Sequence, residues 1–174
     1  MNLREQLRHN LQGDVVVVGI GNPCRGDDGA GSCVAQRINS APGVYVIDAQ
    51  EVPENHLQQI ADQHPDTIVL IDCVDMKSAP GSVALFEEHE TIAYWPSTHR
   101  VPMSLLVDYL ERTTRARIFV IAIQPQQTGF VAPMSAEVLS SVASIADILN
   151  EVFSARGTAA GSECAYPQRG DMPA

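Results

Sequence analysis

Basic residues are scarce in this sequence. Its 11 Lys and Arg stand against 21 Asp and Glu, so that the formal net charge is −10 with His neutral. Binding to nucleic acid or to an anionic membrane surface depends on Lys and Arg side chains that neutralise phosphates. We therefore expect neither kind of partner, and we look instead for a small molecule, a metal or another protein.

Paired cysteines and long apolar runs are also missing. The four cysteines are scattered and contain no Cys-x-x-Cys pair, which argues against a zinc ribbon and against a disulfide scaffold. The first ten residues mix charged side chains with only two leucines, unlike the hydrophobic region of a signal peptide. No apolar run approaches the ~20 residues that a membrane helix requires. We expect reduced thiols and a cytoplasmic location.

What the sequence does contain is enough apolar material for one folded domain. Hydrophobic residues make up 45% of the 174 residues, and the chain is too short for two full domains. Strand and helix patterns alternate through residues 14–153, which is typical of an α/β domain with a largely parallel sheet. Three leucines at helical spacing predict a short helix within residues 1–13. Residues 154–174 are rich in Gly, Ala, Ser and Pro, and we expect a disordered tail there.

Five segments have the apolar character of strands. The unbroken β-branched run at residues 15–20 predicts a strand covered on both faces, whereas the more clearly alternating pattern at residues 82–86 predicts a partly exposed strand. The expected strands are Val15–Ile20, Val44–Ala49, Thr67–Cys73, Ser82–Phe86 and Arg117–Ile123.

Helical patterns fill the gaps between these strands. Asp27 or Asp28 can cap a helix after the first strand, and Pro53 opens another helix after the second. A helical stripe begins just after His99, and Ser135 is the cap candidate for the last helix. The stripe consists of Val101, Leu105, Leu106, Tyr109 and Leu110.

Polar residues gather where the strands end. In an open parallel sheet, ligands bind beyond the carboxyl ends of the strands, because the loops converge there and helix N-termini point their amides inward. Two or more carboxylates and one imidazole from separate loops could hold a divalent metal with open coordination positions. The polar residues in question are Asn22, Asp27, Asp28, Asp48, Glu51, Asp72, Asp75 and Gln124, with His99 just ahead of a helix.

Several of these residues also have a simpler interpretation. Asp28 could be only a helix cap, and His99 taken alone could be a surface or capping histidine. Asp72 is harder to explain structurally, because burying a carboxylate without a partner at the end of an apolar strand is costly. The segment 19–21 looks like the start of a dinucleotide-binding loop, but Cys24 stands where that motif needs its third glycine.

Five motifs follow one another through about residues 14–152. They are Gly19–Gly31, Pro53-Glu54-Asn55, Leu70-Ile71-Asp72, Ser97-Thr98-His99, and Ile123-Gln124-Pro125 with Gly129-Phe130 and Pro133-Met134-Ser135. Together they resemble the motifs of the hydrogenase maturation proteases, endopeptidases that trim the C-terminal extension from the large subunit of nickel-iron hydrogenases. The second and fifth motifs look most like the branch that serves formate-hydrogenlyase hydrogenases.

The resemblance implies a fold and a site. The fold is a three-layer, doubly wound α/β domain of the phosphorylase/hydrolase-like kind, with a twisted, mostly parallel five-stranded sheet flanked by helices. The family's nickel-contacting residues carry over to Asp28, Asp72 and His99, which would be both metal ligands and catalytic residues of an aspartic-type endopeptidase. Position in the motif favours Asp28 over the adjacent Asp27. If water attacks the scissile bond, Asp28 or Asp72 could act as general base.

The resemblance also implies a partner. Nickel would arrive already seated in the large-subunit precursor of a nickel-iron hydrogenase, and the enzyme, which we expect to be a monomer, would cleave only the metallated substrate. Whether nickel polarises the scissile carbonyl, generates a hydroxide or serves for recognition alone stays open.

Two other functions are compatible with these residues. A thiol hydrolase could use Cys24 or Cys73 with His99, although no motif supplies an adjacent base. A non-catalytic assembly protein could bind nickel and check the large subunit without cutting it.

Overall fold

A five-stranded sheet forms the centre of the protein, whose computed structural model describes residues 2–87 and 102–160. The strand order is β2-β1-β3-β5-β4, and only β4 runs antiparallel to its neighbour. The strands are β1 (Val15–Ile20), β2 (Val44–Gln50), β3 (Thr67–Cys73), β4 (Val83–Phe86) and β5 (Arg117–Ile123). The mostly parallel five-stranded sheet is therefore confirmed, and each expected strand agrees with the observed bounds to within one residue.

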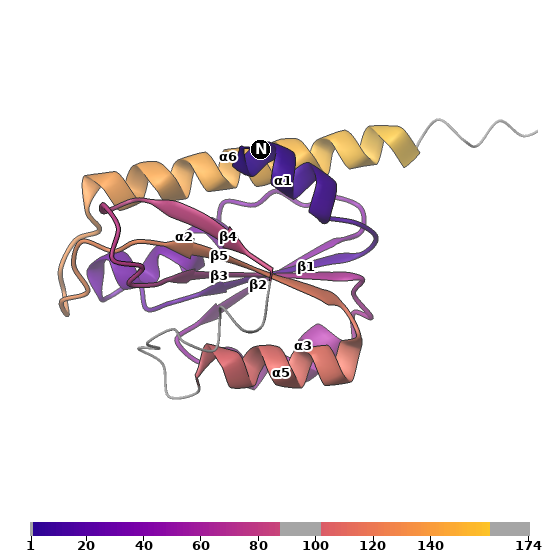
Figure 1. Cartoon of the computed structure of the whole chain (residues 1–174), viewed down its shortest axis with the longest axis horizontal. Coiled ribbons are helices and arrows are strands. Elements are labelled where there is room, and N and C mark those ends of the chain that lie inside the picture. The colour runs from indigo at the N-terminus through magenta and orange to yellow at the C-terminus, as the bar shows by residue number, and fades with distance from the viewer. Residues whose placement is uncertain (1, 88–101, 161–174) are drawn as a thin grey trace, which may run out of the picture.

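Helices cover both faces of this sheet and complete three layers (Figure 1). One face carries α1 (Leu3–Asn10), α2 (Ala30–Ala35) and α6 (Ala136–Ala160), and the other carries α3 (Leu57–Ala61) and α5 (Met103–Thr114). Two 3₁₀ turns, η1 (Gly26–Gly29) and η2 (Pro53–His56), lead into α2 and α3. The flanking layers thus match the expected α/β class.

The alternation of side chains along β3 divides the core between the two faces. Val69, Ile71 and Cys73 pack in the cluster under α2 and α6, whereas Ile68 and Leu70 pack in the cluster under α5. Every residue of β3 is buried, as expected for a central parallel strand. By the same alternation, Asp72 falls on the α5 face, next to Cys73 on the α2 face.

Close contact between α2 and the sheet depends on Gly31. A Cβ atom at Gly31 would lie 2.0 Å from the carbonyl oxygen of Ile71 and 2.3 Å from that of Ile20. Because such distances are far below van der Waals contact, only glycine allows α2 to lie this close to β1 and β3. The contact places η1, which precedes α2, beside the carboxyl ends of both strands.

In α5 the expected apolar stripe is wrong at two positions. Leu105 and Tyr109 are 59% and 44% exposed, while Met103 and Val107 are buried beside the correctly predicted Leu106 and Leu110. Residues three and four apart share a helix face, so positions 103, 106, 107 and 110 form one side of α5. Positions 105 and 109 lie on a different side of the helix. Val101 lies outside the described residues.

The last helix runs further than expected. Residues 154–160 continue α6 where the sequence predicts a tail, and Arg156 donates a hydrogen bond to the carbonyl oxygen of Gly13. This bond lies beyond the last apolar contacts, Val152 and Phe153, and ties the additional turn to the N-terminal segment. The remainder of the expected tail, residues 161–174, lies outside the described residues.

By length and composition, α6 could also cross a membrane. Its segment Ala136–Arg156 has a mean hydropathy of 1.3. In the fold, however, Val138, Val142 and Leu149 are completely buried in the core cluster, and Arg4 and Arg8 of α1 pair with Glu151 on the helix surface. These contacts are those of a core helix in a globular domain.

Candidate active site

A cleft of about 530 Å³ opens beyond the carboxyl ends of β3 and β5. Its lining comes from the loops after β1, β3 and β5, as expected for an open parallel sheet. The lining residues are Asp28, Cys73, Asp75, Gln124, Pro125, Gln126, Gln127 and Thr128. One of the three predicted site residues, Asp28, therefore faces this cleft directly.

A tight turn after β1 holds Asp28. The side chain is only 4% exposed, and its Oδ2 accepts a hydrogen bond of 3.0 Å from the backbone N–H of Asn22. Gly21 has a φ of +128°, and a Cβ atom there would lie 1.7 Å from the carbonyl oxygen of Asp28. Only glycine permits this close return of the chain. The turn thus fixes the Asp28 carboxylate beside the end of β1.

The neighbouring Asp27 has a different role. It is completely buried, and its Oδ1 accepts a bond of 2.6 Å from the backbone N–H of Ser135. Its Oδ2 accepts bonds from the backbone N–H groups of Gln126 (2.8 Å) and Gln127 (3.0 Å) and from the Ser135 hydroxyl (3.0 Å). Asp27 therefore clamps η1 to the loop after β5.

Two opposing effects act on the ionisation of Asp27. Burial by itself raises the pKa of the carboxyl group, but the hydrogen bonds from Ser135, Gln127 and Gln126 favour the charged form. The hydrogen bonds prevail, and the pKa of Asp27 lies below its ordinary value. The clamp is accordingly an ionised carboxylate.

The expectation that Asp27 or Asp28 caps the next helix is wrong. Gly29 occupies the N-cap position of α2, with no side-chain capping bond. The physical reason is that the carboxylates accept hydrogen bonds elsewhere, Asp27 from the loop after β5 and Asp28 from Asn22. Ser135 does precede α6, where its carbonyl oxygen accepts from Leu139, but its hydroxyl donates to Asp27.

Asp72 is the last but one residue of β3, next to Cys73, which lines the cleft. It is 5% exposed, and its Oδ1 accepts a hydrogen bond of 2.7 Å from the N–H of Cys73. Burial, followed by the negative charges of Asp72, Asp27 and Asp28, raises the pKa of the Cys73 thiol. The charges of all three carboxylates act on this one thiol, so Asp28 and Asp72 lie at the same end of the sheet.

The third predicted ligand, His99, lies outside the described residues. Within residues 2–87 and 102–160, no group of three His, Cys, Asp or Glu side chains is arranged to hold a metal ion. The structure thus brings together two of the three predicted residues, both of them carboxylates.

Neither cysteine at this end of the sheet is suited to nucleophilic catalysis. A thiolate is the reactive form of cysteine, and the raised pKa of Cys73 disfavours it. Cys24 is exposed on the loop after β1, where its backbone N–H donates to Asn22, and it does not line the cleft. These surroundings argue against the thiol hydrolase that the sequence left open.

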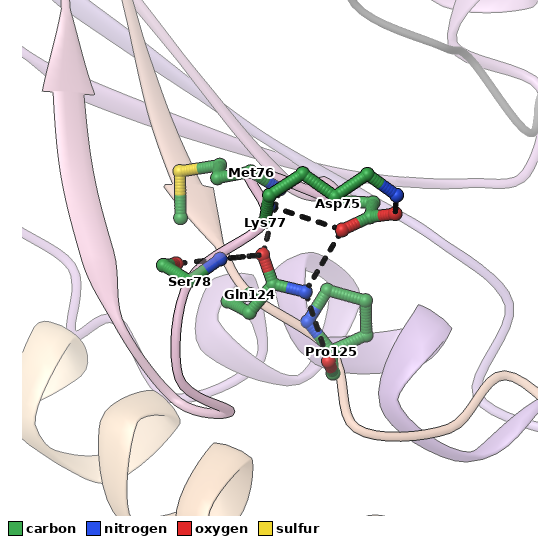
Figure 2. A network of polar contacts seen from close by, with 6 residues as sticks. All are labelled: Asp75, Met76, Lys77, Ser78, Gln124 and Pro125. Carbon is green, nitrogen blue, oxygen red and sulfur yellow. Dashed lines mark hydrogen bonds and ion pairs between the residues drawn. The ribbon is translucent and has the colours of Figure 1, made fainter.

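Gln124 lines the cleft and is the centre of a network of polar contacts, which Figure 2 shows. Its side chain is 6% exposed, and its Oε1 accepts from the backbone N–H groups of Met76 (2.6 Å) and Ser78 (3.3 Å). Its Nε2 donates to Asp75 Oδ1 (3.2 Å) and to the Pro125 carbonyl oxygen (3.1 Å). Gln124 thereby ties the loop after β3 to the end of β5. The sequence predicted that Gln124 lies at the rim of the sheet, but it did not predict that Gln124 links these two segments.

Asp75 adds a further negative charge to the cleft. Hydrogen bonds from the Lys77 and Gln124 side chains lower the pKa of Asp75 to about 2, so this carboxylate is ionised at neutral pH. By contrast, Asp48 near the end of β2 and Glu51 just after it are not among the residues lining the cleft; they accept hydrogen bonds from Gln36 and Asn22, respectively.

The fold and the sequence both resemble known proteins. A family model described as hydrogenase maturation protease matches residues 32–152. The hydrogenase 3 maturation protease of Escherichia coli K12 is 31% identical over 133 residues, which are 75% of this chain and 85% of that protein. The crystal structure of HycI, a NiFe hydrogenase maturation protease from Thermococcus kodakarensis, has a TM-score of 0.79 at 28% identity, covering 86% of this chain and 99% of that one.

A second solved structure agrees. The solution structure of the endopeptidase HycI from Escherichia coli has a TM-score of 0.72 at 28% identity and covers 79% of this chain and 89% of that one. The family model spans more than half of the chain, and the five ordered motifs predicted the same family independently. This chain therefore belongs to the hydrogenase maturation protease family and is a hydrolase of the endopeptidase class.

Proposed function

We propose that this protein removes the C-terminal extension from the large-subunit precursor of a nickel-iron hydrogenase, and that it recognises nickel already bound in that precursor through Asp28, Asp72 and His99. The observation that carries the proposal is a pair of buried carboxylates at the carboxyl end of the sheet: Asp28, which lines the cleft, and Asp72, whose neighbour Cys73 also lines it. Carboxylate oxygens at the edge of a cleft can bind a cation that enters it.

The donor set supports a metal that is delivered by the substrate. Two carboxylates and one imidazole are oxygen and nitrogen ligands that suit nickel, and they lack the thiolates of a closed structural zinc site. Three protein ligands leave coordination positions for groups of the precursor. The nickel is then part of the substrate, and cleavage is restricted to precursors that have received it.

The carboxylates can also move the proton that hydrolysis requires. Water adds to the scissile carbonyl carbon, gives its proton to Asp28 or Asp72, and that proton passes to the leaving amine as the peptide bond breaks. Asp27 takes no part in this transfer, because hydrogen bonds from Ser135, Gln126 and Gln127 occupy its carboxylate. Its role is to hold the turn that carries Asp28.

The setting that we propose is a monomer acting in the cytoplasm on a folded protein substrate. The surplus of acidic residues supports this choice, since nucleic acid and anionic membranes repel a chain with a net charge of −10. Free enzyme need not hold any metal under this proposal.

The test compares nickel-loaded with nickel-free precursor, each incubated with the enzyme and analysed by mass spectrometry. We expect only the loaded precursor to lose its extension, and we expect Asp72→Asn to abolish that loss. Equal cleavage of both precursors, or full activity of the variant, would contradict the proposed nickel recognition.

The same experiment separates the two other functions. A non-catalytic assembly protein would bind the loaded precursor without changing its mass. A thiol hydrolase would lose activity when Cys24 and Cys73 are both replaced by Ala, whereas we expect that double variant to keep cleaving.

A further inference from the structure

The loop between β5 and α6 exposes two adjacent apolar side chains. Phe130 and Val131 are 75% and 77% exposed, more than any other large hydrophobic side chain in the described part of the chain. The whole loop, residues 124–135, contains no charged residue, although the chain has 21 acidic and 11 basic residues. A single exposed apolar side chain is ordinary, but an adjacent pair on an uncharged loop marks a contact surface.

The backbone at this tip is strained. Val131 has a φ of +61°, in the left-handed region, where a β-branched residue is a clear outlier. Its N–H donates to the carbonyl oxygen of Cys24 at 2.8 Å, and the N–H of Ala132 donates to Gly129 at 3.2 Å. Because the Val131 side chain is exposed, its packing does not offset the strain. Strain of this kind persists where the surroundings enforce it, and it is concentrated at ligand-binding sites.

The tip is held at the edge of the cleft. Residues 126–128 of the same loop line the cleft, only two positions before Phe130. Asp27 binds the loop on both sides of the tip, through Gln126 and Gln127 before it and through Ser135 after it. The bond from Val131 to Cys24 adds a link to the loop after β1. The position of the tip is therefore set relative to Asp28.

We propose that Phe130 and Val131 are the docking point for the folded large-subunit precursor, and that they pack against an uncharged apolar patch next to the extension that enters the cleft. This inference rests on the proposed function. The occupant is a protein surface because the tip is exposed and continues the loop that lines the cleft into which the peptide must pass. Exposed aromatic side chains at the centre of an interface commonly contribute much of the binding energy.

Cleavage kinetics on the nickel-loaded full-length precursor test this docking point. We expect Phe130→Ser to raise KM by about tenfold or more, the loss expected for a hot-spot residue, with kcat unchanged. Val131→Asn should also raise KM while leaving the melting temperature unchanged or higher, since Asn tolerates the left-handed region. Lower affinity with equal or higher stability is a combination that misfolding cannot produce.

The matched control is Tyr45→Ser. Tyr45 is an exposed aromatic residue near the amino end of the edge strand β2, whereas the cleft lies beyond the carboxyl ends of β3 and β5. Its replacement should leave KM for the precursor unchanged. An equal rise of KM in the control and in Phe130→Ser would overturn the proposal.

The remaining outcomes separate the docking point from the catalytic function. Unchanged KM in both tip variants, with normal cleavage by the wild type, would overturn the docking point and leave the endopeptidase function standing. The wild type could instead bind the precursor without ever cleaving it, while Phe130→Ser fails to bind. That result would support docking and contradict the proposed function. Light scattering could also show that the wild type is a dimer and that Phe130→Ser is a monomer. The tip would then bind a second copy of this chain, and the proposal would be overturned.

Discussion

The two ends of the sheet both carry carboxylates and a cavity, but they use them differently. At the amino end, a cavity of about 290 Å³ is lined by Asp14, and the exposed Asp66 accepts a hydrogen bond of 2.8 Å from the Asp14 N–H. At the carboxyl end, Asp28 and Asp72 are at most 5% exposed beside a cleft of about 530 Å³. Solvated carboxylates can serve as simple links between loops, whereas a buried carboxylate costs free energy that its hydrogen bonds or a ligand must offset.

The carboxyl end contains the same contrast on a smaller scale. Asp27 and Asp28 are neighbours in one 3₁₀ turn and are both buried. Asp27 turns toward the loop before α6 and holds it, while Asp28 faces the cleft. Burial alone therefore does not identify a functional carboxylate; the groups that its oxygens face do.

The largest effect that we expect is on cleavage. Asp28→Asn keeps the shape of the side chain and an acceptor for Asn22 but removes the charge, so cleavage of the loaded precursor should fall by about 100-fold or more. Asp66→Asn makes the matched change at the amino end and should leave the rate unchanged. Mass spectrometry of the precursor over time measures both. Similar rates for the two variants would remove the distinction between the ends of the sheet.

The second prediction concerns stability. Asp27→Ala leaves the buried backbone N–H of Ser135 and the partly buried N–H groups of Gln126 and Gln127 without their acceptor, which should lower the free energy of unfolding by about 3 kcal/mol. Ser135→Ala removes only the hydroxyl bond and should cost about 1 kcal/mol. Urea denaturation gives both values. If Asp27→Ala proved as stable as the wild type, Asp27 would not be the clamp described here.

The smallest effect is on the pH dependence of stability. The pKa of Asp27 is lowered in the folded protein, so its contribution is fully present above the unfolded-state value of about 3.9 and is lost as the pH falls through the folded-state pKa. Asn does not titrate, and Asp27→Asn should therefore be less stable than the wild type at pH 6, with a gap that narrows below pH ~4. Unfolding measured from pH 6 down to pH 3 tests this. A gap that stays constant would show that the charge of Asp27 does not stabilise the fold.

The strands were the most predictable part of the fold. Runs such as 67–73 are apolar throughout because the parallel sheet buries both of their faces, so their ends are visible in the sequence. The face of α5 was less predictable. Apolar residues occupy two adjacent sides of that helix, and only packing against the sheet decides that Met103 and Val107 are inside and Leu105 and Tyr109 outside.

The candidate site was predictable in its residue types and incomplete in its roles. Position after a strand marked Asp28, Asp72 and Gln124 as rim residues, because ligands bind beyond the carboxyl ends of parallel strands. The network of Gln124 with the loop after β3 joins residues 46 to 49 positions apart and has no signature in the sequence. The proposed ligand role of His99 stays a prediction.

By itself, the sequence determined the order of strands and helices, the family and the carboxylates to consider, since these depend on local apolar patterns and on ordered motifs. Only the tertiary structure decided that Asp27 is a clamp, that Asp28 faces the cleft and that Cys73 is a poor nucleophile. The partners of Asp27 lie 99 to 108 residues further along the chain. A carboxylate and an amide that far apart become neighbours only when the sheet brings the loops after β1 and β5 together.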